Sequence, residues 1–472
     1  MQLKEMRKLI SFFLILSFSN HFLFGQENFS FSEDRITLRD SSIIYINSDI
    51  IPALKIRDRL MLINSNNKDQ DIFSSIYGLG VNFNYSDKFI FRSSFDFITG
   101  DYDMLIKDYK DSLNIYPLFG EDNQRFLLDC KYKFNNFIDI HIGNGTHFIG
   151  SGYQSLLLSD KHSPYPYLKL RTKFGKVKYY NLYSTFLNAG LIDYGRKKHA
   201  ASHYLEFNLT DNINIGVFET VLWLSKIEND NRGYEFAYMN PIIFYRPVEF
   251  SQKSGKGNAL MGLNFDATTM SSTLYGQFIL DDLNISRQKD FDENYSSGFF
   301  QNKFGFQLGL KTSIKDLKFL IEYNQVQPYT YGHRTILQNY SHMNEALAHP
   351  LGANFKEIIC VVEYAKKKWN YKIKIIKANI GLDSLDTHYG QDIFSSDIDA
   401  STGGQYSYGN YNGQGVLTNW YTVNPEITYS LKWADIFGSI NYRRKKSNLL
   451  NQHVIWYSIG LRTYPFYYNT DY

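Results

Sequence analysis

Apolar and polar residues alternate with period two over most of the chain. In the clearest run, residues 258–267, only Leu260 breaks the pattern. Such a period indicates strands with one apolar and one polar face. The apolar face of this run consists of Ala259, Met261, Leu263, Phe265 and Ala267, and the polar face of Asn258, Gly262, Asn264 and Asp266.

The same alternation recurs along the chain and predicts many strands of similar length. Seventeen predicted strands begin near residues 77, 89, 125, 137, 167, 177, 202, 213, 258, 271, 302, 317, 354, 369, 419, 435 and 452. A soluble sandwich also alternates, so the period alone does not decide the fold class.

The connections between these strands decide it, because tight and long ones alternate strictly. The tight connections are 87–88, 134–136, 175–176, 211–212, 269–270, 313–316, 366–368 and 433–434. The long ones are 99–124, 145–166, 186–201, 224–257, 282–301, 328–353, 380–418 and the shorter 445–451. Short turns on one rim and long loops on the other are typical of outer-membrane barrels, whose short turns are periplasmic.

Strand parity adds one more strand. If the turn at 87–88 is periplasmic, an earlier strand must carry the chain outward, and residues 52–64 are the candidate. The sequence therefore predicts an all-β fold, an antiparallel transmembrane β-barrel of about 18 strands with short periplasmic turns and long extracellular loops.

The N-terminus predicts export. Lys4, Arg7 and Lys8 precede an apolar run at 9–18 and a short region ending near Gly25, which is the pattern of a secretory signal peptide. We expect a signal peptide at 1–25, a periplasmic lead-in at 26–51 and one barrel domain at 52–472. Past residue 25, no apolar stretch reaches the roughly 18 residues of a membrane helix.

The two faces of the strands predict the partners of the barrel. The apolar face should contact outer-membrane lipid, because an outward Lys or Arg at mid-membrane costs about 2–4 kcal/mol. Phe, Tyr and Trp make up 17% of the chain, which suits interfacial girdles. Tyr464, Phe466, Tyr467 and Tyr468 follow the last strand, and such an aromatic end is a cue for the barrel-assembly machinery.

The polar faces predict a charged lumen with both signs. Its expected members are Asp139, His141, Lys169, Arg171, Lys173, Glu206, Asp266, Lys303, Lys311, Glu322, Lys372 and Lys374. The formal net charge of +3 leaves no large one-signed field, so nucleic acid is not an expected partner. Cys130 and Cys360 form no disulfide framework or zinc motif, and we predict no cofactor.

Four clusters of residues suggest chemistry, two of them in the segment 143–170. The glycines of 143–170 resemble a phosphate loop, but no P-loop motif occurs, and a loop folded over or into the barrel is the alternative. Ser151 near His147 and His162 would suit a hydrolase, although the nucleophile elbow is missing.

Metal sites are the other possibility. His342, Glu345 and His349 would share one face of a helical turn and mimic metal ligands, although a polar helical turn in an extracellular loop explains them as well. An acidic loop offers oxygen ligands for calcium but lacks the EF-hand order, so a solvated loop is the default. Its members are Asp383, Asp386, Asp392, Asp397 and Asp399. We predict no metal site.

A tyrosine-rich loop is the candidate ligand-binding surface. Tyr406, Tyr408 and Tyr411 lie among Gly, Ser and Asn in 401–415. Tyrosine offers contact area at low entropic cost, and its ring also suits sugars. A loop tip without a ligand is the alternative.

Four segments carry a family resemblance, which covers roughly residues 140–365. They are GSGYQSLLLSDKHSPYPYLKLRTKFGKVKYYNLYS, SHYLEFNLTDNINIGVFETVLW, YMNPIIFYRPVEFSQKSGKGNALMGLNFDAT and SHMNEALAHPLGANF. They resemble the capsule-assembly Wzi family of outer-membrane barrels, and within it the gliding-motility RemB-like branch of Bacteroidota.

The resemblance implies a non-enzymatic barrel that holds or organises surface polysaccharide, as capsule or exopolysaccharide, or one that serves gliding motility at the cell surface. Its shared motifs, including Tyr238, Asn240, Pro241 and Arg246, are explained as loop architecture, and no ligand-binding residue carries over. From the charged lumen alone, a passive outer-membrane channel is the alternative, although the large loops, such as 224–257, suggest a plug. A membrane-embedded hydrolase ranks behind both.

Overall fold

The computed structural model describes residues 50–65, 70–86, 88–100, 124–188, 196–227, 230–231, 233–240, 257–283, 298–384, 387–397, 408–431 and 434–462. Eighteen long strands of this part form one sheet. They are β1 (Ile50–Ser65), β2 (Gln70–Ser86), β3 (Phe89–Gly100), β4 (Gln124–Lys133), β5 (Ile138–Gly145), β6 (Tyr165–Phe174), β7 (Val177–Leu187), β8 (Lys197–Asn208), β9 (Ile213–Leu224), β12 (Asn258–Thr269), β13 (Ser272–Asp282), β14 (Lys303–Ile314), β15 (Leu317–Val326), β18 (Phe355–Lys366), β19 (Trp369–Leu382), β20 (Val416–Ser430), β21 (Asp435–Lys446) and β22 (Asn451–Arg462).

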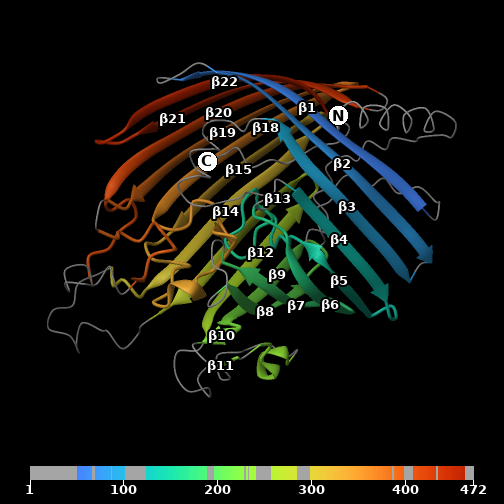
Figure 1. The fold of residues 1–472 in the computed structure, drawn as a ribbon, viewed down its shortest axis with the longest axis vertical. Coiled ribbons are helices and arrows are strands. Elements are labelled where there is room, and N and C mark those ends of the chain that lie inside the picture. Colours follow the sequence, from blue (N-terminus) through green and yellow to red (C-terminus); the bar gives the residue numbers. More distant parts are fainter. Residues whose placement is uncertain are drawn as a thin grey trace, which may run out of the picture.

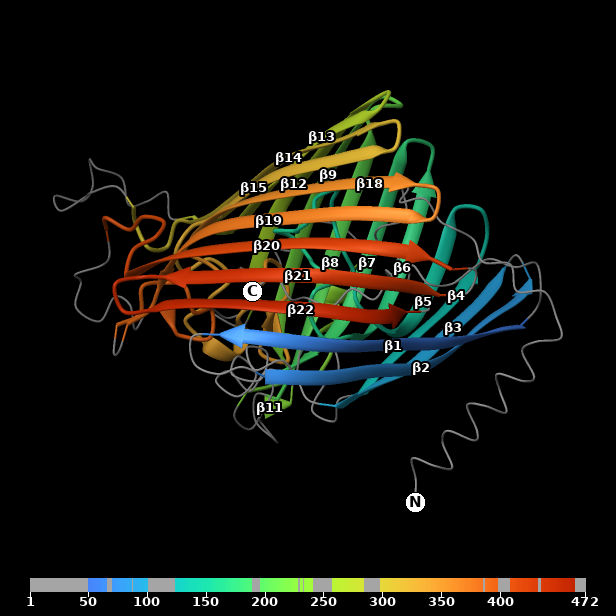
Figure 2. The ribbon, with the colours of Figure 1, turned by 90° about the horizontal axis from the view of Figure 1, so that it is seen from above.

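Each long strand pairs with the next in antiparallel register, and the sheet closes on itself. Closure is made by β1 and β22, whose register runs from Arg57 opposite Arg462 to Ser65 opposite Val454. Figure 2 shows β1 beside β22, and Figure 1 shows the strands arranged around an enclosed space. A closed ring leaves no unpaired strand edge for lipid to satisfy. The eighteen-stranded antiparallel barrel that the sequence predicts is confirmed.

Small elements occur only in the connections of the described part. They are β10 (Lys226–Ile227), β11 (Asp230–Asn231), β16 (Ser341–His342), β17 (Glu345–Ala346) and the 3-10 turns η2 (Phe236–Met239) and η3 (Ile336–Gln338). No helix among the described residues is long and apolar enough to cross a membrane.

The strand alternation places apolar side chains outside and polar ones inside. On the outer face, Leu263 is 51% exposed and Ile459 61% exposed, although both are apolar. On the inner face, Lys169 and Glu322 are buried. An exposed apolar band on the outside of a closed barrel is what a bilayer requires.

Some expected features lie beyond this description. The predicted signal peptide at 1–25 and the terminal aromatic cluster at 464–468 lie outside the described residues. Most of the expected lead-in, 26–49, also lies outside them, but Ile50 and Ile51 belong to β1.

Candidate functional site

Two long connections on the loop-bearing rim fold into the lumen. We call them the plug and define it as residues 146–164, between β5 and β6, and 327–354, between β15 and β18. In Figure 1 the teal trace that follows β5 lies inside the ring of strands. The plug confirms the plainer alternative for the glycine-rich segment 143–170, a loop folded into the barrel.

The plug has an apolar core of its own, continuous with the wall. Leu156, Leu157 and Leu158 of the first loop are buried, and Tyr331 and Tyr340 of the second lie in the same cluster. The cluster also includes the plug residues Leu347 and Leu351 and the wall residues Phe186, Leu260, Ile279 and Phe355. Because packed apolar cores leave few voids larger than a water molecule, the two loops leave little open space in the lumen around this cluster.

Side chains of the wall strands β13 and β15 hold the backbone of the first loop. Glu322 on β15 accepts hydrogen bonds from the backbone N–H of Tyr153 at 2.6 Å and of Gln154 at 3.0 Å. Gln277 on β13 accepts one from Leu156 N–H at 2.8 Å and donates one to the Ile149 carbonyl at 2.8 Å. These wall residues lie near the middle of their strands, so the plug reaches mid-barrel.

Glycines allow this close approach. A Cβ atom on Gly150 would lie 2.0 Å from Gln277 Nε2, and one on Gly152 would lie 2.6 Å from a Glu322 oxygen. On the wall, a Cβ atom on Gly262 would lie 2.3 Å from Leu157 Cδ2. The glycines that resemble a phosphate loop in the sequence therefore have a packing role: they let backbone and wall meet.

The second loop contains a tight hairpin, not the helical turn that the sequence predicts. Ser341 and His342 pair with Glu345 and Ala346 as β16 and β17. The two residues between the strands, Met343 and Asn344, have φ of 50° and 59°. Two left-handed residues are what a two-residue hairpin turn requires, and they end any helix.

The three residues of the suggested metal cluster bind different partners. His342 Nδ1 accepts a hydrogen bond from Leu187 N–H at 3.0 Å, and His349 Nε2 lies 2.9 Å from Glu357. Glu345 accepts from the N–H of Ser163 at 2.7 Å and from its hydroxyl at 3.0 Å. Burial raises the pKa of Glu345 to about 8 and lowers that of His342 to about 3. Glu345 thus joins the two plug loops.

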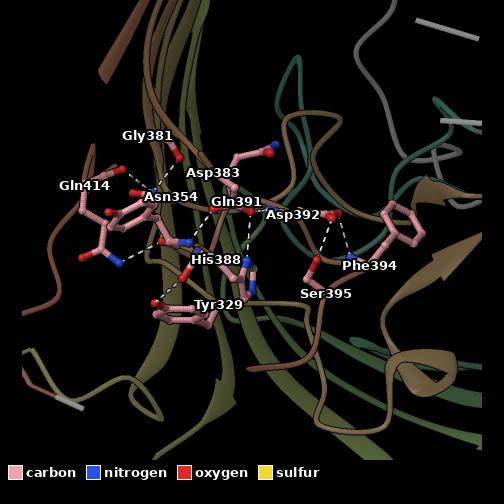
Figure 3. Close-up of polar contacts among 12 residues, drawn as sticks. Tyr329, Asn354, Gly381, Asp383, His388, Gln391, Asp392, Phe394, Ser395 and Gln414 are labelled. Atoms are coloured by element: carbon pink, nitrogen blue, oxygen red, sulfur yellow. Dashed lines mark hydrogen bonds and ion pairs between the residues drawn. The ribbon is translucent and has the colours of Figure 1, made fainter. Parts of the chain in front are cut away.

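A second group of ordered loop residues contacts the plug, and we call it the cap: residues 387–397 and 408–415. Asn354 joins it to the wall, because its Nδ2 donates to the carbonyls of Gly381 at 2.8 Å and Gln414 at 3.1 Å. Its Oδ1 accepts from Gly413 N–H at 2.8 Å. Figure 3 shows Asn354 between the end of β19 and the cap.

Asp383 organises the first part of the cap. Its carboxylate accepts from the N–H groups of Tyr389 at 2.5 Å and Asp392 at 3.1 Å, and lies 2.9 Å from His388 Nδ1 (Figure 3). Burial raises the pKa of Asp383, but the hydrogen bonds and charge of His388 and these N–H groups outweigh it and lower the pKa overall.

The suggested calcium ligands engage protein partners of their own. Asp392 accepts from Phe394 N–H and Ser395 Oγ, and Asp397 pairs with Lys303 on β14 at 2.7 Å. Asp386 and Asp399 lie outside the described residues. Within the described ranges, no group of three or more His, Cys, Asp or Glu could hold a metal ion.

The two histidines near Ser151 in the sequence contact other residues through Nδ1. His147 Nδ1 lies 3.0 Å from the Tyr165 hydroxyl, and His162 Nδ1 lies 2.9 Å from the Ser163 carbonyl. The Nε2 atoms of both rings are buried without a hydrogen-bond partner.

Part of the predicted tyrosine-rich loop, residues 408–415, lies among the described residues. Tyr406 lies outside the described residues, and Tyr408 packs on Phe299 with ring centroids 5.2 Å apart. Tyr411 is 64% exposed. Its backbone N–H donates to Gln414 Oε1 at 3.2 Å, and Gln414 in turn donates to the Tyr389 carbonyl at 2.8 Å. The cap thus presents the ring of Tyr411 to solvent from a hydrogen-bonded loop.

The inner wall carries one group that the sequence analysis missed. The Arg443 guanidinium lies between two indole rings, 5.3 Å from the centroid of Trp420 and 5.2 Å from that of Trp456. Lys445 lies 3.8 Å from the Trp420 ring. Alternation assigns all four residues to the inner face, but only the register across β20, β21 and β22 brings them together.

A closed barrel with an apolar outer band, a polar inner wall and a lumen occupied by its own loops is an outer-membrane β-barrel of the plugged kind.

Comparison with known proteins agrees with this class. No family model and no curated protein matches the sequence. Among solved structures, the chain resembles Wzi of Escherichia coli, an outer-membrane protein involved in group 1 capsule assembly and described as a carbohydrate-binding β-barrel. That match has a TM-score of 0.57 and 13% identity and covers 88% of this chain and 85% of Wzi. At this identity, the likeness concerns the fold.

Other similar structures come from Pseudomonas aeruginosa. OprD matches with a TM-score of 0.44 and 11% identity, over 88% of this chain and 96% of OprD. OpdK matches with a TM-score of 0.48 and 9% identity, over 88% and 98%.

Proposed function

We propose that this protein is a non-enzymatic outer-membrane barrel that holds or organises surface polysaccharide through the cap around Tyr411. The observation that carries the proposal is the ring of Tyr411, 64% exposed on a loop fixed by Gln414 and Asn354. An exposed aromatic ring on a hydrogen-bonded loop suits a sugar, because binding orders little of the protein. The carbohydrate-binding description of Wzi, whose fold is similar, supports the same ligand class.

Binding of surface polysaccharide purified from the source cells tests this proposal. The purified full-length protein should bind it, Tyr411→Phe should retain binding, and Tyr411→Ala should weaken it. Leu449→Ala is the matched control, since Leu449 is 77% exposed in the turn between β21 and β22. Equal binding by all four proteins would reject a role for Tyr411.

We propose one of two cellular roles for this barrel, polysaccharide attachment or gliding motility. A deletion strain scored for capsule retention and for spreading on agar separates them. Loss of retained polysaccharide supports the attachment role, and loss of spreading with normal retention supports the motility role.

A passive channel is the second candidate that the charged lumen suggests. The plug argues against it, because 146–164 and 327–354 occupy the lumen with a buried apolar core.

A further inference from the structure

Four cations lie together on the outside of the barrel, near the ends of strands β18 to β21 on the loop-bearing rim. We call them the basic rim patch: Lys356, Lys377, Arg444 and Lys446. The register places Lys377 opposite Tyr421, and Tyr421 opposite Arg444. The next row outward runs from Lys356 through Asn379 and Asn419 to Lys446. The four cations thus occupy two adjacent cross-strand rows.

These side chains point away from the lumen. All four are exposed, whereas their neighbours along the strands, such as Ala378 and Arg443, are buried. They share strand parity with apolar outer residues such as Ile373 and Ile440, which are 36% and 43% exposed. Side chains two residues apart on a strand face the same side of a sheet, so the patch lies on the outer, lipid-facing surface.

The patch lies directly above the apolar band. The row immediately toward the membrane centre has no charged member and consists of Cys360, Ile375, Val423, Tyr442 and Ile455. Tyr421, on the patch row, packs against Tyr442 with ring centroids 6.4 Å apart. Because aromatic girdles mark the edge of the hydrocarbon, the cations are level with lipid headgroups of the outer leaflet.

Among the described residues, no acidic side chain compensates the charge of the patch. No carboxylate occurs in the two rows, and within the described part of the chain no ion pair joins the four cations to an acidic side chain. At the opposite rim of β18 to β21, the outermost outward row contains one cation, Lys366, with Trp369, Tyr429 and Ile436.

From this placement we propose that the basic rim patch binds the phosphate groups of a phosphorylated glycolipid of the outer leaflet. Neighbouring strands lie about 4.8 Å apart and alternate residues about 7 Å apart along a strand. Lys356 with Lys377, and Arg444 with Lys446, therefore form two cation pairs separated by roughly two strand spacings, about 10 Å. Two separated cation pairs suit a headgroup with two phosphates, and the apolar row beneath contacts its acyl chains.

The test measures binding of bisphosphorylated lipid A to the purified full-length protein in detergent. The double variant Lys377→Gln with Arg444→Gln should bind it more weakly by on the order of fivefold for each cation, about 25-fold in total. Wild type should also prefer bisphosphorylated over dephosphorylated lipid A. Heat-modifiable migration on a gel confirms that each variant retains the folded barrel.

The matched control is Lys366→Gln with Lys367→Gln, two exposed lysines at the opposite end of β18. It should bind like wild type. Equal affinity of the rim double variant and wild type would overturn the proposal, as would an equal loss in the control pair. Displacement of the lipid by excess inorganic phosphate would overturn the lipid as occupant, since free phosphate would then suffice.

Discussion

Glu322→Gln provides a sharp test of how the plug is held. One Glu322 oxygen accepts from Tyr153 N–H and the Tyr275 hydroxyl, and the other accepts from Gln154 N–H and Asn324 Nδ2. An amide retains one acceptor oxygen and turns two N–H donors toward the other pair. At least one backbone N–H of the plug then loses its acceptor, which costs about 1–3 kcal/mol for a buried donor.

This cost destabilises the closed plug relative to the open one, because the N–H groups of a released loop hydrogen-bond to water. It should raise the open population about 5- to 150-fold, at 1.4 kcal/mol per tenfold. Hydrogen exchange measures this as faster exchange of the amides in 149–158, with strand amides unchanged. Glu206→Gln is the matched control, since Glu206 pairs with Lys178 in the wall at 3.0 Å. Unchanged exchange of 149–158 in Glu322→Gln would refute the reasoning.

Three further outcomes are expected. Leu157→Ala, in the apolar core of the plug, should destabilise the plug by ~2–5 kcal/mol, measured by the same exchange experiment. Burial raises the pKa of Glu345 to about 8, above its ordinary 4.5, so the neutral side chain is the form that the fold favours. Its contribution to stability is fully present below about pH 4.5 and is lost as pH rises through about 8, because a charge must then form in the buried site. Thermal melting across this range should show the loss, and Glu345→Gln should remove it. The pKa of Asp383 is lowered, so its contribution is present above pH 3.8 and lost at more acid pH. Asp383→Asn should flatten that acid dependence of melting and speed exchange at the amide of Tyr389.

The barrel was predictable because its determinants are local. Alternation and connection length repeat along the chain, and the strands at 89, 177, 213, 258, 317, 369 and 435 begin where the sequence places them. The deviations have a physical reason. β2 begins at Gln70, not near 77, because its pairing with β1 continues to Ile63. Cross-strand hydrogen bonds extend β2 over residues 70–76, where the sequence does not show the alternation of a membrane-spanning strand.

The plug was predictable only as a possibility, because its determinants are not local. The Tyr331 hydroxyl donates to the Leu156 carbonyl at 2.8 Å across 175 positions of sequence, and no period in either loop announces that contact. The hairpin of β16 and β17 was missed for a related reason. Its turn residues, Met343 and Asn344, include none of the glycines that usually mark a left-handed turn.

The same limit explains the site residues. Composition drew attention to the loop of Tyr411, since tyrosine among small polar residues indicates a recognition loop, and ligand binding there stays a prediction. The basic rim patch and the Trp420, Arg443 and Trp456 stack were not predictable, because each depends on the exact register across three or four strands, which alternation does not fix.

The central claim is that the lumen of this outer-membrane barrel is filled by its own loops, and planar-bilayer recording tests it most directly. The account predicts that folded, heat-modifiable wild-type protein inserts without ionic current steps. Regular open-pore steps from the same folded protein would contradict it.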